Sequence, residues 1–263
     1  MVQQPALFVS HGSPMWAIAP GKAGPALMGW ATQRPKPQAI LVVSPHWMTA
    51  GEVRVMSHSK PATWHDFSGF PPALYELSYP APGAPELAHA VLSALEPVVT
   101  QMGWCIHLDA QRPLDHGAWV PLRYLYPEAD VPVFQVSLNT TAKPSELFGV
   151  GRQLQALREQ GVMILATGSM THNLVERNQA GADLTYVQAF PSWVRTKLEA
   201  ADQAAVLDWA AQAPHATQAH PTDEHFLPLF IAMGAAHPHE HPQWITDDVQ
   251  FDFLAMDAIA WGA

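Results

Sequence analysis

The sequence predicts an α/β protein with three layers, α/β/α, around a mostly parallel mixed sheet that ends in an edge hairpin. Short runs rich in β-branched residues recur along the chain, and segments with helical character separate several of them. The chain has 263 residues, of which 48% are hydrophobic, so it can bury a substantial core. Strands that alternate with helices typically form a parallel sheet covered on both faces.

The strands are expected where apolar runs are bounded by turn residues. These runs are Ala6–Ser10, Ala39–Ser44, Val53–Met56, Val131–Leu138 and Val162–Thr167. Near the C-terminus the stretch QWITDDVQFDFLAMDAIAWG, residues 243–262, alternates polar and apolar residues. That alternation predicts a hairpin at one edge of the sheet.

The helices are expected between these runs. They are Ala23–Thr32, Pro85–Leu95, Ala118–Leu125, Pro144–Glu159 and Trp193–Ala211. A further helix is expected to begin near Thr222, a good N-cap residue, with Asp223 and Glu224 in its first turn. Neither a repeat nor a linker interrupts the pattern, so residues 1–263 are interpreted as a single domain.

Charge and composition argue against several classes of protein. The net charge is −10, with no cluster of lysine and arginine, so a nucleic-acid partner is not expected. Apolar runs are shorter than the roughly 20 residues of a membrane helix, and the N-terminus does not resemble a secretory signal. The sequence therefore predicts a cytoplasmic protein, either a monomer or a small homo-oligomer. The single cysteine, Cys105, is interpreted as a buried structural thiol.

Histidine is unusually frequent and is placed at strand ends. The chain has 14 histidines against 13 lysines and arginines combined. His11, His46 and His172 each follow an apolar run closely. In open α/β sheets, ligands bind outside the carboxyl ends of the parallel strands, so these side chains are expected at one rim. His116 precedes a helical stretch and His225 begins an apolar helical face, which adds two further candidates.

Imidazoles gathered at one rim favour a metal site. Three neutral histidines hold zinc or ferrous iron and leave positions open for a substrate. A lone histidine beside a core strand is more often a hydrogen-bonded structural residue, and the His-Glu-x-x-His spacing of many zinc enzymes is absent. Glu224 is an alternative carboxylate ligand in a two-histidine site. Ser13 and Ser169 lack the setting of a hydrolase nucleophile.

Six blocks in order along the chain resemble one known family. They are HGSPM from His11, SPHW from Ser44, HDFSGFPPALYELSYPAPGAPELA from His65, LDHGAWVPL from Leu114, GSMTHNL from Gly168 and PTDEHFLPLFIAMGA from Pro221. Together they resemble the DOPA-dioxygenase-type, class III extradiol ring-cleaving dioxygenases of the LigB-like superfamily. The resemblance spans approximately residues 6–262.

The resemblance implies an α/β/α core with one non-haem divalent metal. His11, His46 and His225 match the metal-ligand positions, with Glu224 as the alternative to His225. His172 matches the acid/base histidine, which in this comparison also approaches the metal, and His116 matches a histidine of the catalytic pocket. Fe(II) supports turnover in this family, and Zn(II) is expected in the protein as isolated. The chain departs from the family pattern at Pro45, where relatives carry a small residue.

The implied reaction is extradiol cleavage of a catechol, DOPA-like or related, by O2 to give a muconic semialdehyde. Trp47, Phe67, Phe70 and Trp119 are candidate aromatic walls for the substrate ring. Cationic side chains available to an anionic substrate are few, namely Arg112, Arg123 and Arg177. Two other functions remain open: a zinc-dependent hydrolase that uses the same histidines, and a metal-binding module without turnover.

Overall fold

The structure is a computed structural model that describes residues 2–176 and 183–262. Its centre is an eight-stranded sheet with the strand order β4-β3-β5-β2-β6-β1-β8-β7. The strands are β1 (Ala6–Ser10), β2 (Ala39–Thr49), β3 (Glu52–Met56), β4 (Cys105–Asp109), β5 (Val133–Asn139), β6 (Val162–Gly168), β7 (Gln243–Gln250) and β8 (Leu254–Trp261). The five expected apolar runs are all strands, which confirms the predicted α/β class.

The middle of the sheet is parallel and its flanks are mixed. Neighbouring strands β5, β2, β6 and β1 all pair in parallel. The hairpin predicted for residues 243–262 is confirmed as β7 and β8, and β8 pairs antiparallel with β1. β3 pairs antiparallel with β5 and parallel with β4. Because β1, β2 and β6 run side by side in one direction, their carboxyl ends reach the same rim of the sheet.

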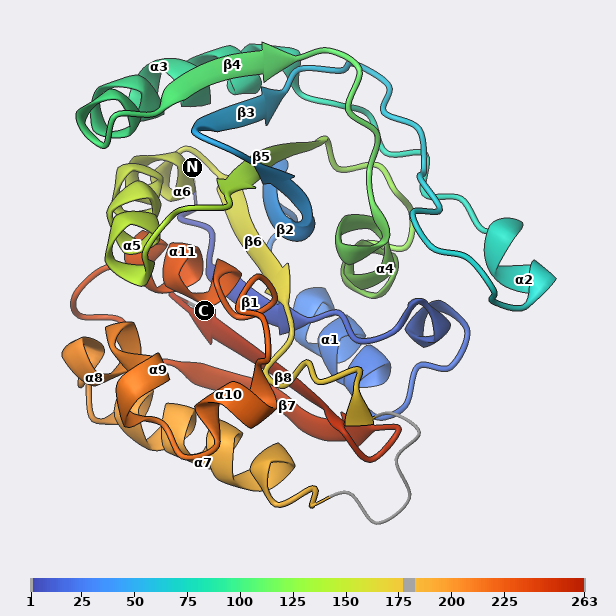
Figure 1. Cartoon of the computed structure of the whole chain (residues 1–263). Helices are drawn as coiled ribbons and strands as arrows, with labels where there is room; N and C mark the ends of the chain where they lie inside the picture. Colours follow the sequence, from blue (N-terminus) through green and yellow to red (C-terminus); the bar gives the residue numbers. More distant parts are fainter. Residues whose placement is uncertain (1, 177–182, 263) are drawn as a thin grey trace.

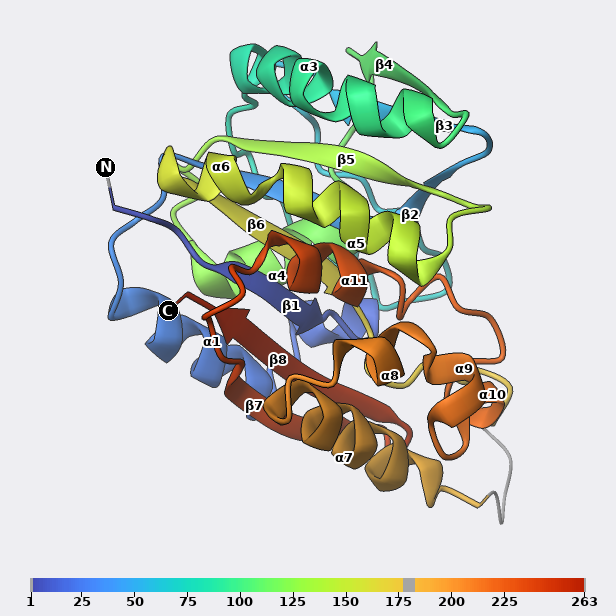
Figure 2. The ribbon, with the colours of Figure 1, turned by 90° about the vertical axis from the view of Figure 1, so that its left-hand side faces the viewer.

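Helices cover both faces of this sheet (Figure 1). They are α1 (Ala23–Thr32), α2 (Pro72–Tyr75), α3 (Pro85–Gln101), α4 (His116–Leu125), α5 (Pro144–Gln153), α6 (Gln155–Glu159), α7 (Tyr186–Glu199), α8 (Gln203–Leu207), α9 (Trp209–Gln212), α10 (Ala216–Ala219) and α11 (Pro228–Ala235), with a short 3₁₀ turn η1 (Pro14–Ala17). In Figure 2, α5, α6 and α11 lie in front of the strands and α4 lies behind them. The contacts agree, since α11 packs on β6 and β1 while α4 packs on β2.

The core consists of the apolar strands and the helix faces that cover them. β1 and β6 are buried along their whole length, as is the C-terminal strand β8. α11 is buried on all sides because it lies between the sheet and α5. None of the helices in the described ranges combines the length and the apolar character needed to cross a membrane.

Three expectations about individual segments are wrong. Cys105 is exposed, because it begins β4 at the outer edge of the sheet. The helix expected from Thr222 begins only at Pro228, and the residues before it form turns. The helix expected over Trp193–Ala211 is divided among α7, α8 and α9, with Ala201 in the left-handed region of backbone conformation at the break.

Candidate metal centre and active site

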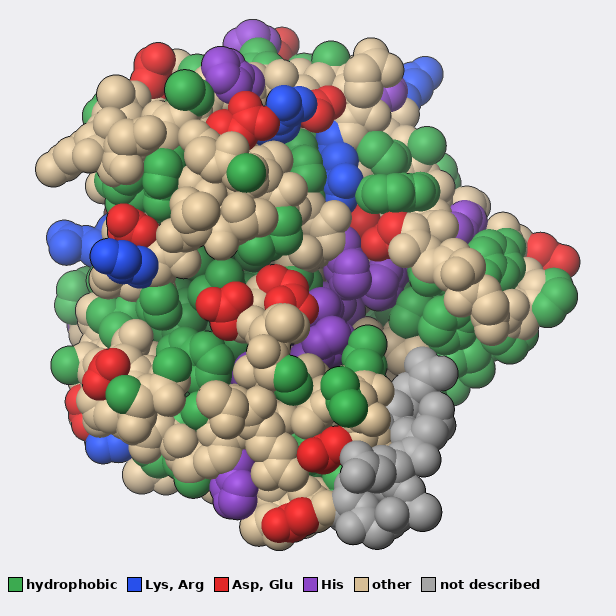
Figure 3. Space-filling model, in the orientation of Figure 1, with side chains coloured by type: hydrophobic (Ala, Val, Ile, Leu, Met, Phe, Trp, Pro, Cys, Tyr) green, Lys and Arg blue, Asp and Glu red, His purple; other side chains and the backbone are tan. Residues whose placement is uncertain are grey.

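Five histidine rings line one cavity at the carboxyl ends of the central parallel strands. The cavity has a volume of about 620 Å³, in the range of roughly 300–1,000 Å³ that is typical of small-molecule sites. The rings belong to His11, His46, His116, His172 and His225. Figure 3 shows histidine side chains gathered in a hollow, with hydrophobic surface beside it. All five histidines that the sequence analysis singled out therefore line the same cavity.

His11 reaches the rim because β1 ends directly before it. Its backbone N–H donates to the carbonyl of Gly168 at 2.9 Å, which continues the β1–β6 pairing by one residue. The side chain is 1% exposed. The pattern of a buried apolar run followed by histidine therefore fixes this imidazole at the floor of the cavity.

His46 reaches the cavity through an irregularity inside a strand. β2 does not end at Ser44, as the sequence suggested, but continues to Thr49 with a shift of register against β5 between Val43 and Met48. Pro45 lies in this interval and has no N–H to donate to a neighbouring strand. A bulge of this kind re-aims a side chain, and here it directs the His46 ring toward His11.

His225 lies in the turns before α11 and approaches the end of β6 closely. Its carbonyl accepts a hydrogen bond from the N–H of Ser169 at 2.8 Å. A Cβ atom on Gly168 would collide with that carbonyl, so glycine is required for this approach. The segment from 221 to 227 is thereby fixed against the strand that precedes His172.

The distances between these rings fit a common metal ion. The Nε2 atoms of His11 and His46 lie 3.1 Å apart. Two nitrogens bound to one ion at about 2.0–2.1 Å each, at angles between 90° and tetrahedral, lie about 2.8–3.4 Å apart. The ring of His225 has its centroid 5.4 Å from that of His11 and 5.2 Å from that of His46. His11 and His46 therefore have the spacing of two ligands of one metal ion, and the ring of His225 lies beside them.

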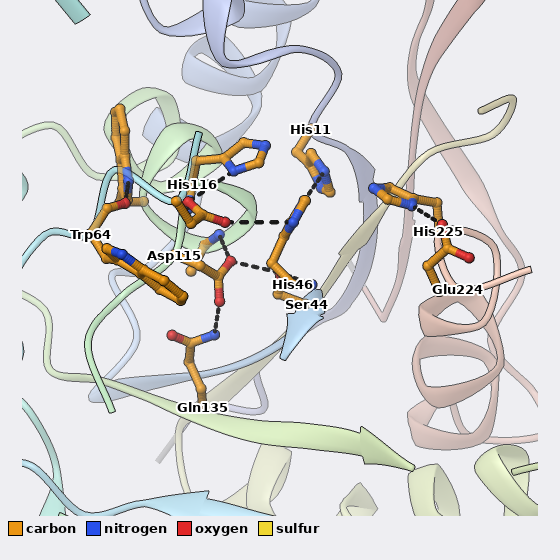
Figure 4. A network of polar contacts seen from close by, with 12 residues as sticks. His11, Ser44, His46, Trp64, Asp115, His116, Gln135, Glu224 and His225 are labelled. Carbon is orange, nitrogen blue, oxygen red and sulfur yellow. Dashed lines mark hydrogen bonds and ion pairs between the residues drawn. The ribbon is translucent and has the colours of Figure 1, made fainter. Parts of the chain in front are cut away.

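Carboxylates hold two of these three rings from behind (Figure 4). The Nδ1–H of His225 donates to Glu224 Oε1 at 2.9 Å, and Glu224 also accepts from the hydroxyl of Thr222. Nδ1 of His46 lies 3.5 Å from Asp66 Oδ2. A carboxylate on Nδ1 fixes the tautomer in which Nε2 carries the free lone pair, the form that binds a metal.

His116 shares Asp66 with His46. It is the first residue of α4, which Asp115 caps by accepting from the N–H of Ala118. Asp66 Oδ1 accepts from both the backbone N–H and the Nδ1–H of His116, at 2.9 and 3.0 Å. The centroids of the His46 and His116 rings are 4.1 Å apart.

His172 stacks on His225. Their ring centroids are 3.5 Å apart and their planes differ by 12°. The backbone N–H of His172 donates to Ala219, and its Nδ1 lies 3.9 Å from Glu224 Oε1. Among the described residues, two groups of side chains have the spacing of metal ligands: His11 with His46 and His116, and His172 with Glu224 and His225.

A buried polar network supports the His46 bulge from below (Figure 4). Asp115 is fully buried and accepts from the Ser44 hydroxyl at 2.7 Å, from Arg112 at 2.6 Å and from Gln135 at 3.0 Å. Arg112 also donates to the carbonyl of His46. The sequence suggested Arg112 as a contact for an anionic substrate, but its guanidinium is committed to this network and stacks on Trp47 and Trp64.

Burial keeps the central imidazoles neutral. It lowers the pKa of His46 to about 4, helped by the nearby His116 ring and opposed by Asp115 and Asp66. Burial and the neighbouring rings hold the pKa of His11 and of His225 well below the usual value. Burial also lowers the pKa of His172, against the opposing charge of Glu224. A neutral imidazole can bind a metal ion without first losing a proton. These histidines are therefore in the form that binds a cation at neutral pH.

Asp66 stays ionised between two histidines. Burial alone would raise its pKa, but the hydrogen bonds and charges of His116 and His46 outweigh that effect and lower the pKa. The sequence reasoning missed Asp66, although it lies in the HDF segment that carries the family resemblance. The signal was its position next to the candidate aromatic wall Phe67.

Two of the four aromatic residues expected to line the substrate site do so. Phe67 and Phe70 line the cavity, whereas Trp47 and Trp119 do not. Trp119 is fully buried and its indole N–H donates to the carbonyl of Trp64. The structure adds apolar lining that the sequence did not indicate, from Leu174 and from Phe251 and Phe253 at the end of the C-terminal hairpin. Arg177 lies outside the described residues.

His220 is a further buried histidine, outside the cavity. It is 4% exposed and packs among Phe190, Trp209 and Phe226. One ring nitrogen donates to the carbonyl of Met170 at 3.0 Å. His220 therefore supports the segment that leads to His172.

Comparisons with known proteins agree with this geometry. The family profile described as "Catalytic LigB subunit of aromatic ring-opening dioxygenase" matches residues 5–256. A protein of Beta vulgaris named "4,5-DOPA dioxygenase extradiol" is 39% identical over 87% of this chain and 85% of its own length. A protein of Escherichia coli K12 with the same name is 34% identical over 99% and 95%. A crystal structure of an uncharacterized protein from Escherichia coli K12 covers 98% of this chain and all of its own, with a TM-score of 0.78 and 29% identity.

Proposed function

This chain belongs to the LigB family and is an extradiol ring-cleaving dioxygenase of class III, and we propose that it opens catechols, DOPA-like or related, at a metal held by His11, His46 and His225. The observation that carries the residue assignment is the pair of facing Nε2 atoms, 3.1 Å apart, with His225 beside them. The relatives named for DOPA supply the substrate class.

The ligand set follows from which nitrogens are already occupied. Glu224 accepts from His225 and Thr222, so it serves better to orient His225 than to replace it. His116 gives its Nδ1–H to Asp66, and its ring also lies near His11. Like His46 and His225, His116 has a carboxylate on Nδ1 that leaves Nε2 free, and it has the spacing of a metal ligand with His11 and His46. We assign His116 to the substrate side because the LDHGAWVPL block, by resemblance to the family, places a pocket histidine at this position.

Fe(II) is the metal that suits this reaction, whereas Zn(II) is expected to occupy the same ligands in the protein as isolated. A bound divalent metal supplies a Lewis acid for the two catechol oxygens and, as iron, the redox chemistry with O2. Histidine and carboxylate oxygen donors suit both ions, so the identity of the metal requires measurement.

His172 and His116 handle the protons. The pKa of His172 is lowered by burial, so at neutral pH it is a free base able to take a proton from a catechol hydroxyl. Glu224, 3.9 Å from His172 Nδ1, stabilises the imidazolium that results. His116, held by Asp66 through Nδ1–H, presents the lone pair of Nε2; once Nε2 has taken up a proton from the substrate, it donates a hydrogen bond toward negative charge on oxygen. Ring opening beside the two hydroxyls, with both oxygen atoms of O2 incorporated, gives a muconic semialdehyde.

The test is turnover of the purified chain loaded anaerobically with Fe(II), given a catechol and then O2. A yellow product and consumption of one O2 per catechol are expected. His172→Ala should keep its iron and lose turnover, while His46→Ala should lose both. His239→Ala, at an exposed histidine, is the matched control. A zinc hydrolase would be indifferent to O2, and a silent binding module would hold iron without product, so either result overturns the proposal.

Cytoplasmic location and the absence of a nucleic-acid partner remain predictions from composition, as does the assembly as a monomer or small homo-oligomer. Cell fractionation and the sedimentation behaviour of the purified chain measure them directly.

A further inference from the structure

The turn of the β7–β8 hairpin holds a bulky residue in an unfavourable conformation. Phe251 and Asp252 both have positive φ, 53° and 64°. Turns with positive φ favour glycine, asparagine and aspartate, so Asp252 is at home there and Phe251 is not. A phenylalanine in this region is an outlier that persists only when the surrounding structure imposes it.

The surrounding structure does impose it, from two sides. Thr171 is fully buried; its hydroxyl donates to the carbonyl of Phe253 at 2.8 Å and accepts from the N–H of Ala255 at 2.9 Å. On the other side, Asp248 accepts from the N–H of Lys22 and Gln250 donates to the carbonyl of Ala19. The turn is therefore fixed to the segments that follow His11 and contain His172.

Phe251 is held where it meets the substrate cavity. Its side chain is 55% exposed, yet it lines the same cavity as the five histidines. Phe253, 3% exposed, also lines this cavity. Phe67 and Phe70, from the loop before α2, line the cavity too, with their ring centroids 5.3 Å apart. The lining outside the histidines is thus mainly apolar and comes from segments far apart in the sequence.

We propose that Phe251 is a specificity-determining residue that selects catechols whose ring carries an apolar substituent. The inference deepens the proposed function and rests on it. When the two hydroxyls lie among the histidines, a substituent on the ring is left to the rest of the lining, which includes Phe251 and Phe70. An alkyl group gains from contact with these rings, because it leaves water for an apolar surface.

A charged substituent gains nothing from the same surface. Within the described residues, the cavity lining includes neither a lysine or arginine nor an aspartate or glutamate. The ammonium and carboxylate of an amino-acid side chain would lose hydration there without a partner of opposite charge. We therefore expect 4-ethylcatechol to be a better substrate than DOPA, although relatives are named for DOPA.

The experiment compares catechol, 4-ethylcatechol and DOPA in the iron-loaded full chain and in Phe251→Asn. The unaltered chain should show the highest kcat/KM with 4-ethylcatechol. Phe251→Asn should lose about tenfold in kcat/KM for 4-ethylcatechol and change little for catechol, since a hydrophobic contact of this size is worth about that factor. Because asparagine accepts positive φ, the variant should melt at the same temperature as the unaltered chain or higher.

Two control variants distinguish substrate selection by the Phe251 side chain from a general effect on the fold of the hairpin. Asp252→Asn changes the neighbouring strained position and keeps the ring, and it should leave all three kcat/KM values unchanged. Val249→Ala removes an exposed apolar side chain of the same hairpin that does not line the cavity. If Phe251→Asn lowers kcat/KM equally for all three substrates, Phe251 supports the fold and the proposal is wrong. A higher kcat/KM for DOPA than for 4-ethylcatechol in the unaltered chain also overturns it.

Binding distinguishes this proposal from the proposed function. Anaerobic calorimetry measures Kd for catechol and 4-ethylcatechol without turnover. If the iron-loaded chain cleaves none of the three compounds, the dioxygenase proposal fails, and the ratio of the two Kd values still decides whether Phe251 selects apolar substituents. Equal ratios in the unaltered chain and in Phe251→Asn would contradict the role of Phe251.

Discussion

Asp66 holds two histidines with different proposed roles through one carboxylate. One oxygen accepts both hydrogen bonds from His116, and the other lies 3.5 Å from Nδ1 of His46. Its side chain is 7% exposed, so water does not compete freely for these contacts. Asp66 therefore links the orientation of a metal ligand to that of a substrate-side histidine.

Replacing Asp66 by asparagine should weaken metal binding and turnover together. The amide keeps the size of the carboxylate but removes its charge and one acceptor, so the tautomers of His46 and His116 are no longer fixed. Changes of this kind typically cost about 10–100-fold in metal affinity or activity. Competition with a chromophoric chelator measures the affinity for Zn(II), and the rate with catechol is measured at saturating Fe(II).

Asp130→Asn is the matched control for Asp66→Asn. Asp130 is exposed and pairs with Lys36 on the surface, so its loss should leave both measurements unchanged. Unaltered Zn(II) affinity in Asp66→Asn would contradict the role given to Asp66.

At the scale of residues, the sequence predicted the histidines well and their partners poorly. His11, His46 and His172 were found because a histidine after an apolar run is uncommon and strand ends meet at one rim. Asp66, by contrast, lies in a loop between β3 and α2, where no periodicity indicates which way a side chain points. Phe251 was missed because a hairpin turn with phenylalanine violates the usual turn chemistry.

Among the elements, α4 approaches β2 so closely that a single glycine decides the position of His46. A Cβ atom on Gly117 would collide with the Ser44 hydroxyl and would lie 2.9 Å from Cδ2 of the His46 ring. Glycine at the start of α4 is therefore required by the His46 bulge and not by the helix itself, which would form better with alanine.

Gly117→Ala should destabilise the fold by about 1–3 kcal/mol and displace the His46 ring. Gly29→Ala, in the exposed part of α1, meets no atom within 4 Å and should stabilise the fold by up to about 1 kcal/mol. Urea unfolding gives both changes, and Zn(II) affinity should fall only in Gly117→Ala. An unchanged affinity for Zn(II) in Gly117→Ala would contradict this prediction, because it would show that the His46 ring can move aside without losing the metal.

The C-terminal hairpin contains a buried acid that opposes folding at alkaline pH. Asp257 on β8 is 4% exposed and stands opposite Asp247 on β7. Burial raises the pKa of Asp257 to about 7; Arg195 opposes this rise and Asp247 adds to it. The folded chain therefore keeps a proton on Asp257 that the unfolded chain releases near pH 4, so stability falls as the pH rises from about 4 to 7.

Asp257→Asn should remove this penalty. Above pH 7 the variant is expected to be more stable than the unaltered chain by about 2–4 kcal/mol, and near pH 4 the two should be similar. Unfolding by urea at pH 5 and pH 8.5 measures the difference. A gain of equal size at both pH values would mean that the carboxylate charge is not its cause.

The elements themselves were largely predictable, and the exceptions have physical reasons. The central strands β1, β2, β5 and β6 begin with buried, mainly apolar runs, which produces an uninterrupted signal. β4 was missed because it lies at the sheet edge and is half-exposed, with polar residues such as His107. The start of α11 was placed too early because Thr222 and Glu224 look like a helix cap, whereas Pro228 marks the first residue of the helix.

Taken as a whole molecule, the chain is expected to lose stability in mild acid because several buried histidines are neutral in the folded state. Burial lowers the pKa of His220 to about 3 and that of His46 to about 4. The unfolded chain binds these protons near pH 6.5, and the folded chain does not. The contribution of these histidines to stability is therefore complete above about pH 6.5 and is lost progressively as the pH falls below it, opposite in sign to that of Asp257.

Replacing His220 should reduce this acid sensitivity. Glutamine at position 220 keeps a donor for the carbonyl of Met170 and carries no titratable group, so the stability of His220→Gln should fall less steeply between pH 6.5 and 4.5. The metal-free protein is used, with urea unfolding at several pH values. His239→Gln, at an exposed position, should retain the original slope, and an identical slope in His220→Gln would exclude His220 as a source of the effect.

The order of strands in the sheet has a consequence for synthesis on the ribosome. β1, which precedes His11, is made first, but its two neighbours are β6 and β8, near residue 165 and at the end of the chain. The nascent N-terminal strand thus stays unpaired on one side until β6 has emerged, and on the other side until almost the entire polypeptide has emerged. Pairings so distant in sequence form slowly. His225 also lies far along the chain, so the proposed metal site is complete only when most of the polypeptide has been made.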